Sequence, residues 1–175
     1  MSNYLAEQYF IEATELINCW SFADAKKKLE EIIEVEPGYG RAHYQLGWLY
    51  FYKFRDYETA NYHLRLAIKL SPEFPTTYYT YAYLLNEINH PVALQKHAAK
   101  ALTVRGIDTP VIYNELAKSF ELNGNYSEAI CHYRKALKFT LCHEQIGEIE
   151  KHIERVKMKS KTFDSNTFVY KISSE

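Results

Sequence analysis

The chain has 175 residues, 47% of them hydrophobic, so it can bury a core and does not have the composition of a disordered protein. Its 21 basic and 22 acidic residues nearly cancel, which gives no electrostatic reason to expect binding to nucleic acid or to an anionic membrane. The longest near-apolar run, Leu46 to Tyr52, is far shorter than the ~20 residues of a membrane span.

The amino-terminal residues lack the basic and apolar segments of a signal peptide. The three cysteines are an odd number without CxxC spacing, so they do not form a disulfide framework, and we expect free thiols in a reducing compartment. The expected location is cytoplasmic.

Apolar periodicity, together with proline and turn signals at the boundaries, predicts helices throughout. All five prolines fall at expected helix boundaries. In chain order, the expected helices are 4–18, 21–35, 40–53, 56–70, 75–88, 91–104, 110–122, 126–139 and 143–159.

The segment Tyr113 to Leu137 carries a pattern of aromatic, small and turn residues that also occurs earlier in the chain. Its members are Tyr113, Leu116-Ala117, Phe120, Gly124-Asn125-Tyr126, Ala129, Tyr133 and Ala136. This pattern resembles a tetratricopeptide repeat. The small residue of the first helix recurs at the family's spacing of about 34 residues, as Ala13, Gly47, Ala82 and Ala117. The opening aromatic recurs as Tyr9, Tyr78 and Tyr113, and His43 replaces it in the second copy.

The resemblance implies an all-α fold, a right-handed superhelical solenoid of four helical hairpins followed by a capping helix and a tail. The expected repeats within 1–142 are 6–39, 40–74, 75–109 and 110–142. The capping helix is expected over 143–160, where Ile146, Ile149, Ile153 and Val156 share one face. An extended tail is expected over 161–175.

In this family the first helices of the repeats line a concave groove that holds a segment of a partner. Carrying the groove positions onto this sequence gives an unusually aromatic set, and tyrosine and tryptophan are favoured binding anchors. The alternative is that several of these side chains simply pack between helices. The candidate groove residues are Phe10, Ile11, Tyr44, Trp48, Phe51, Tyr52, Tyr79, Tyr83, Asn114 and Lys118.

The resemblance therefore predicts a protein-interaction scaffold or chaperone-like adaptor that holds an apolar segment of a partner protein. A more specific version is a small chaperone of secreted translocator proteins. The polar clamp with which chaperone-binding members hold a carboxylate is absent, since the corresponding positions are Phe10, Thr14, Gln45, Thr76 and Thr80. The alternative function is a structural subunit of a larger assembly that packs through its convex or end faces.

We expect neither catalysis nor a cofactor, because the sequence has no phosphate loop, nucleophile elbow or HExxH motif. Cys131-His132 and Cys142-His143 are adjacent pairs, and neighbouring side chains on a helix point about 100° apart, so neither pair can chelate a metal as a unit.

The last residues are more apolar than a solvated tail usually is, with Phe168, Tyr170 and Ile172 alternating as in an extended segment. We therefore predict that the tail 161–175 docks in the groove of its own chain or builds a homodimer, unless it is a free appendage.

Overall fold

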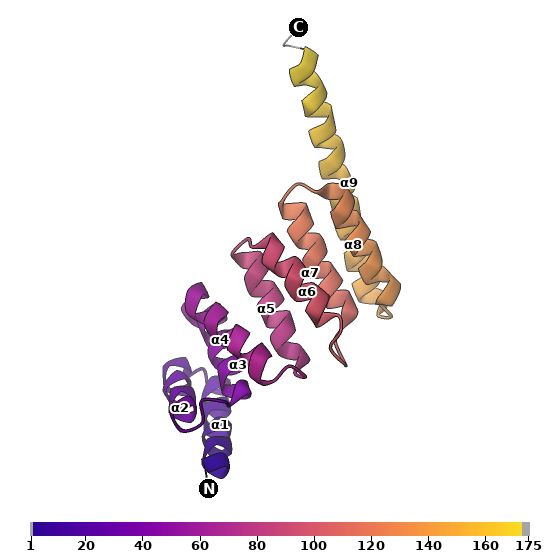
Figure 1. Cartoon of the computed structure of the whole chain (residues 1–175). Coiled ribbons are helices and arrows are strands. Elements are labelled where there is room, and N and C mark those ends of the chain that lie inside the picture. Colours follow the sequence, from indigo (N-terminus) through magenta and orange to yellow (C-terminus); the bar gives the residue numbers. More distant parts are fainter. Residues whose placement is uncertain (1, 173–175) are drawn as a thin grey trace. The chain divides into compact units, whose positions relative to one another are not determined.

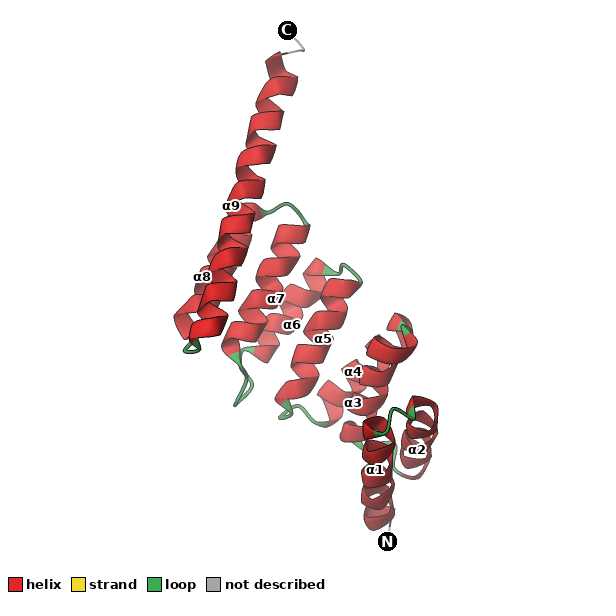
Figure 2. Ribbon diagram, turned by 180° about the vertical axis from the view of Figure 1, so that it is seen from behind, coloured by secondary structure: helices red, strands yellow, loops and turns green. Residues whose placement is uncertain are grey.

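The computed structural model describes the backbone of residues 2–172 and the side chains of residues 4–162, and this part of the chain contains helices and loops but no strand. Figure 1 shows the helices in chain order, and Figure 2 shows the loops that join them. Their bounds are α1 Ser2–Asn18, α2 Phe22–Val35, α3 Gly40–Leu49, η1 Tyr50–Phe54, α4 Tyr57–Leu70, α5 Pro75–Glu87, α6 Pro91–Ala101, α7 Thr109–Leu122, α8 Tyr126–Phe139 and α9 His143–Ile172.

The sequence predicts these boundaries to within a few residues, except at the end of α9. The next largest differences are at α3, which ends at Leu49 where residue 53 was expected because η1 follows it, and at α6, which ends at Ala101 where residue 104 was expected. The chain forms two compact units. The first contains residues 1–88 and 104–106, and the second contains residues 89–103 and 107–175.

In the first unit, α1 pairs with α2 and α3 pairs with α4, while α2 also packs on α3 and α4 on α5. The predicted small residues are fully buried where paired helices meet. Ala13 and Ala25 lie in the contact between α1 and α2, and Gly47 and Ala60 lie in the contact between α3 and α4. Small side chains let the helices approach closely, and larger ones such as Leu29 and Leu64 fill the remaining space.

His43, which replaces the opening aromatic of the second repeat, keeps the hydrogen bond that the aromatic makes elsewhere. Tyr78 donates its hydroxyl to the carbonyl of Pro72, six residues earlier, at 2.9 Å. The His43 Nε2 lies 3.0 Å from the carbonyl of Pro37, also six residues earlier, and therefore carries the proton. Its Nδ1 then accepts from the Nδ1 of buried His63 at 3.0 Å. Burial lowers the pKa of His63 to about 4, which keeps His63 neutral.

The helix α3 ends in a wider turn that the sequence did not reveal. Tyr50–Phe54 form one π-helical turn, and the amide of Asp56 donates to the carbonyl of Tyr50 at 3.0 Å. A π turn takes up more residues per turn than an α-helix, so it changes which side chains lie above one another.

In the second unit, α6 packs on α7, α7 pairs with α8, and α9 packs on α8. Ile149, Ile153 and Val156 of α9 are buried against the α7–α8 pair, as the sequence pattern indicates for a capping helix. Figure 2 shows α9 continuing well beyond this contact.

The extended tail predicted for 161–175 is wrong as far as the described backbone goes, because α9 is continuous to Ile172. Residues 173–175 lie outside the described backbone. Adding residues to an already formed helix costs little compared with starting one, so α9 propagates through a sequence whose alternation indicates a strand. The hydroxyl of Thr162 donates to the carbonyl of Met158, one helical turn earlier, at 3.0 Å.

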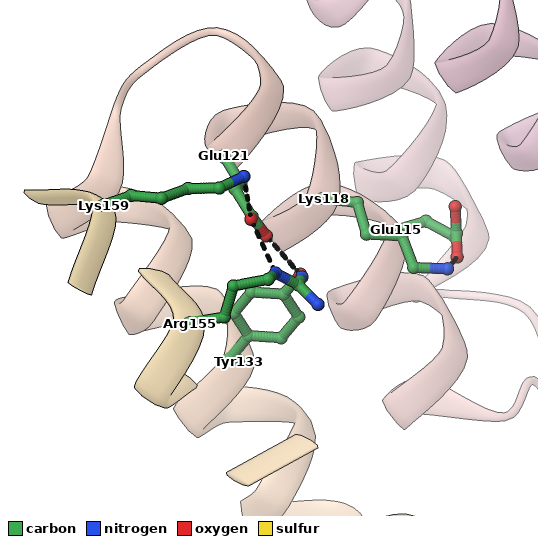
Figure 3. Close-up of polar contacts among 6 residues, drawn as sticks. All are labelled: Glu115, Lys118, Glu121, Tyr133, Arg155 and Lys159. Carbon is green, nitrogen blue, oxygen red and sulfur yellow. Dashed lines mark hydrogen bonds and ion pairs between the residues drawn. The ribbon is translucent and has the colours of Figure 1, made fainter. Parts of the chain in front are cut away.

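A buried carboxylate joins α7 to α8 and α9 (Figure 3). The Glu121 side chain is 5% exposed and accepts two hydrogen bonds from Arg155, at 2.9 and 2.7 Å. Lys159 donates to it at 2.7 Å and the hydroxyl of Tyr133 at 3.1 Å. Burial alone would raise the pKa of Glu121, but the bonds from Arg155 and Lys159 outweigh it and lower that pKa to about 2.

The first prediction concerns the close approach of α3 and α4. A Cβ at Gly47 would lie 2.6 Å from the Leu64 Cγ and 3.2 Å from the Leu64 backbone nitrogen. Gly47→Ala should therefore destabilise the protein by about 1–3 kcal/mol, despite a helix propensity gain of about 1 kcal/mol. Gly147→Ala in α9 is the matched control, because its Cβ would meet nothing within 4 Å. It should be neutral or stabilising in urea unfolding, and equal effects of the two changes would contradict the packing argument.

The second prediction concerns the Glu121 carboxylate. The pKa of Glu121 is about 2 in the folded state and about 4.5 without these partners. Its ionised form therefore adds its full contribution to the free energy of unfolding above pH ~4.5, and this contribution declines as the pH falls toward ~2. Glu121→Gln should lower the free energy of unfolding by about 2 kcal/mol at pH 6 and should flatten its dependence on pH between 4.5 and 2.

Urea unfolding at several pH values measures both effects. Glu154→Gln is the control, because Glu154 forms only an exposed pair with Lys157. The role assigned to Glu121 is refuted if the two variants respond alike.

Candidate functional site

Eight of the ten candidate groove residues belong to the first unit, and the structure separates them by burial. Phe10 and Phe51 are 7% and 4% exposed and belong to the two hydrophobic clusters of this unit, so the alternative of packing between helices holds for them. Ile11 is 54% exposed and Tyr52 is 36% exposed. The other four, Tyr44, Trp48, Tyr79 and Tyr83, are half-buried.

We call Tyr44, Trp48, Tyr52, Tyr79 and Tyr83 the aromatic surface. Three of them follow one another at every fourth residue through α3 and η1, and the other two do so on α5, so each set shares one helix face. The rings of Trp48 and Tyr52 lie 5.5 Å apart.

Tyr44 connects the two sets. Its ring meets Phe74, the residue that precedes α5, edge-on at 5.4 Å. Burial raises the pKa of Tyr44, so its hydroxyl stays protonated. The contact with Phe74 places the Tyr44 ring at the start of α5.

A charged cluster lies beside Phe10. Glu7 accepts from the hydroxyl of Tyr39 and from Arg41, the latter at 3.2 Å, and the Arg41 guanidinium lies 4.2 Å from the Phe10 ring centre. Burial and the bond to Glu7 raise the pKa of Tyr39 to about 12. Glu7 and Arg41 form an exposed polar edge next to an apolar ring.

The remaining two candidates, Asn114 and Lys118, lie on α7 in the second unit, where α9 covers their neighbourhood. Asn114 and His152 both line a cavity of about 120 Å³ between α7 and α9. The Asn114 Oδ1 and the His152 Nδ1 are buried and have no hydrogen-bond partner among the described residues. Lys118 forms an ion pair with the buried Glu115 (Figure 3).

Part of the surface of α7 therefore faces α9. Val111 and Asn114 share the cavity with α9, and Glu121 is bonded to Arg155 and Lys159. Burial lowers the pKa of His152, as do the charges of Arg155 and Lys118. The accessible aromatic residues among the candidates belong to the first unit.

Repeat-based reasoning missed three residues beside Trp48. Trp20 lies in the turn between α1 and α2, Phe22 is the first residue of α2, and Lys53 comes from η1. The Lys53 ammonium lies over the rings of all three aromatic residues, Trp20, Phe22 and Trp48. The groove positions of the family lie on the first helix of each repeat and do not include the α1–α2 turn. The sequence signal that could have indicated these residues is a tryptophan at a turn.

Other chemistry finds less support in the described residues. All three cysteines are exposed free thiols, as predicted, and no group of three or more side chains there could hold a metal ion. None of the described helices combines the length and the apolar character that crossing a membrane requires.

The comparisons with known proteins give a fold. No protein-family model matches the sequence, and no curated protein matches it. Among solved structures, PilW, described as a widely conserved type IV pilus biogenesis factor, superposes with a TM-score of 0.73 at 17% identity, covering 95% of this chain and 74% of that one. PilF of Pseudomonas aeruginosa gives a TM-score of 0.74 at 13% identity, covering 93% of this chain and 72% of that one.

A third structure is YrrB, described as a TPR protein with an unusual peptide-binding site. It matches with a TM-score of 0.66 at 15% identity, covering 87% of this chain and 80% of that one. Identities this low establish the fold alone. The paired helices, the buried small residues at repeat spacing and these likenesses identify the chain as a protein of the tetratricopeptide-repeat fold.

Proposed function

We propose that the protein is a protein-interaction scaffold that holds an apolar segment of a partner against the aromatic surface of its first unit. The fold supports the general role, because solenoids present extended surfaces for binding other proteins. The observation that carries the specific proposal is the accessible ring area of Trp48 and Tyr52, side by side at 5.5 Å.

The chemistry of this surface suits an apolar partner with some polar groups. Tyrosine and tryptophan supply large contact areas at low entropic cost and keep one polar atom for hydrogen bonding. Tyr44 already packs edge-on against Phe74, so part of the surface is ordered before a partner arrives. A pre-ordered surface loses less conformational freedom on binding.

The polar edge formed by Glu7 and Arg41 can orient the partner segment on the first unit. Both side chains are exposed and lie beside Phe10, in the same unit as the aromatic surface. Charged groups at the rim of an interface contribute more to selectivity and association rate than to affinity. We assign the affinity to the rings and the register of the partner to this pair.

We also propose that the protein works in a reducing compartment such as the cytoplasm. Cys19, Cys131 and Cys142 are all exposed, and an oxidising environment would allow exposed thiols to form bridges between molecules.

The third prediction tests the aromatic surface. Trp48→Ala combined with Tyr83→Ala should weaken binding of the captured partner by about 2 kcal/mol, or roughly thirtyfold in Kd. The chain is immobilised, captured proteins are identified by mass spectrometry, and the affinity of the purified partner is measured by calorimetry.

Tyr62→Ala is the control, because Tyr62 is 60% exposed on α4 and does not belong to the aromatic surface. Circular dichroism checks that each variant is folded. Full retention of partner affinity by a folded double variant would rule out the proposed site, and an equal loss in Tyr62→Ala would do the same. Size-exclusion chromatography with light scattering then distinguishes a transient complex from a stable multi-subunit particle.

A further inference from the structure

Three aromatic rings of the first unit surround one cation. The Lys53 ammonium lies 4.6 Å from the ring centre of Phe22, 5.1 Å from that of Trp20 and 5.2 Å from that of Trp48. The rings of Trp20 and Phe22 are 5.8 Å apart and tilted by 58°. All three distances fall within the roughly 6 Å at which ring faces attract a cation.

No carboxylate among the described residues forms an ion pair with Lys53, and its ammonium contacts these three rings instead. The π turn explains how Lys53 reaches Trp48. In an α-helix, residues five apart point about 140° away from each other, whereas the wider turn of η1 brings them closer to one face. Three rings that gather around a cation without a counter-ion form an aromatic cage.

The position of Trp20 is unfavourable for the backbone and buries little of its ring. Trp20 has a φ of 63°, in the left-handed region that favours glycine, and its side chain is 75% exposed. The amide of Ser21 donates to the carbonyl of Leu16, and that of Trp20 donates to Ile17, which is the helix ending whose left-handed residue is usually glycine.

A left-handed residue also follows α1, η1, α5 and α7, which allows a direct comparison. These residues are Trp20, Arg55, Asn89 and Gly124, in that order. The last two are the residue types that favour this conformation, and tryptophan is not. A strained, exposed aromatic residue whose ring lies beside Phe22 and Lys53 points to a role in binding.

We propose that Trp20, Phe22 and Trp48 form a binding site for a cationic side chain, lysine or arginine, of the partner protein, and that Lys53 occupies this site until the partner displaces it. This inference rests on the proposed function, and it specifies a basic residue next to the partner's apolar segment. Trp48 belongs both to the cage and to the aromatic surface, so one segment can engage both. Lys53 is a flexible side chain without an anion to hold it, which allows displacement.

The test uses the full chain and a matched pair of probes. Choline carries a quaternary ammonium, and 3,3-dimethylbutan-1-ol has the same shape without the charge. The indole N–H signals of Trp20 and Trp48, the two tryptophans of the chain, report binding by NMR at constant ionic strength. Trp20→Gly assigns the two signals.

In Lys53→Ala, choline should shift both indole signals and should bind at least about fivefold more tightly than in the unaltered chain, since the internal competitor is gone. The neutral alcohol should shift them much less in either protein. Trp20→Gly combined with Lys53→Ala should abolish choline binding, and Trp20→Gly alone should leave the melting temperature equal or higher.

Three results would overturn the inference: equal responses to choline and the alcohol, equal choline affinity with and without Lys53, or a lower melting temperature in Trp20→Gly, which would make the ring a packing residue. These measurements do not involve the partner. Choline binding without partner capture would therefore count against the proposed function alone, and partner capture without choline binding would count against the cage alone.

Discussion

The structure depends on how closely the two helices of a pair can approach. At Gly47 the space left for a side chain is so small that a single methyl group would meet Leu64 at 2.6 Å. Ala13, Ala82 and Ala117 hold the corresponding positions in the other repeats and are fully buried. Because the small residue recurs once per repeat, the same spacing recurs along the chain, and the larger residues around it have a fixed volume to fill.

This constraint explains why so much of the fold could be predicted. Small residues, prolines and turn residues mark helix contacts and boundaries by local chemistry, so helices such as α3, α5 and α7 start within one residue of where the sequence indicates. His43 looked like a departure from the pattern, but it preserves the hydrogen bond to Pro37 that an aromatic would be expected to make. The opening position of the repeat thus accepts a histidine that makes the same hydrogen bond to a proline carbonyl six residues earlier.

The missed features share a different cause. The alternation of Phe168, Tyr170 and Ile172 indicates an extended segment, yet their backbone belongs to α9, since a helix that is already nucleated extends more easily than a new element forms. The π turn at Tyr50–Phe54 likewise has no local signal. Both the continuation of α9 and the π turn depend on the helix that precedes them.

The site shows the same division. The groove positions of the family include the partly accessible Trp48 and Tyr52, but they also include the buried Phe10 and Phe51, because a pattern of residue types does not distinguish a ring on the surface from one a few ångströms deeper. On α7, they include Asn114, which lines a cavity together with residues of α9. Sequence reasoning finds the helix face, and the packing of later elements decides how much of it stays open.

The four left-handed turns have an evolutionary consequence. Natural proteins are rarely at their stability optimum, because selection removes only the changes that bring stability below what function requires. Gly124 is already the residue that suits its turn, whereas Trp20 and Arg55 are not. Replacing Trp20 or Arg55 by glycine would therefore suit the backbone of these turns better. The two turns of the first unit are also positions where new side chains can be acquired without disturbing the core.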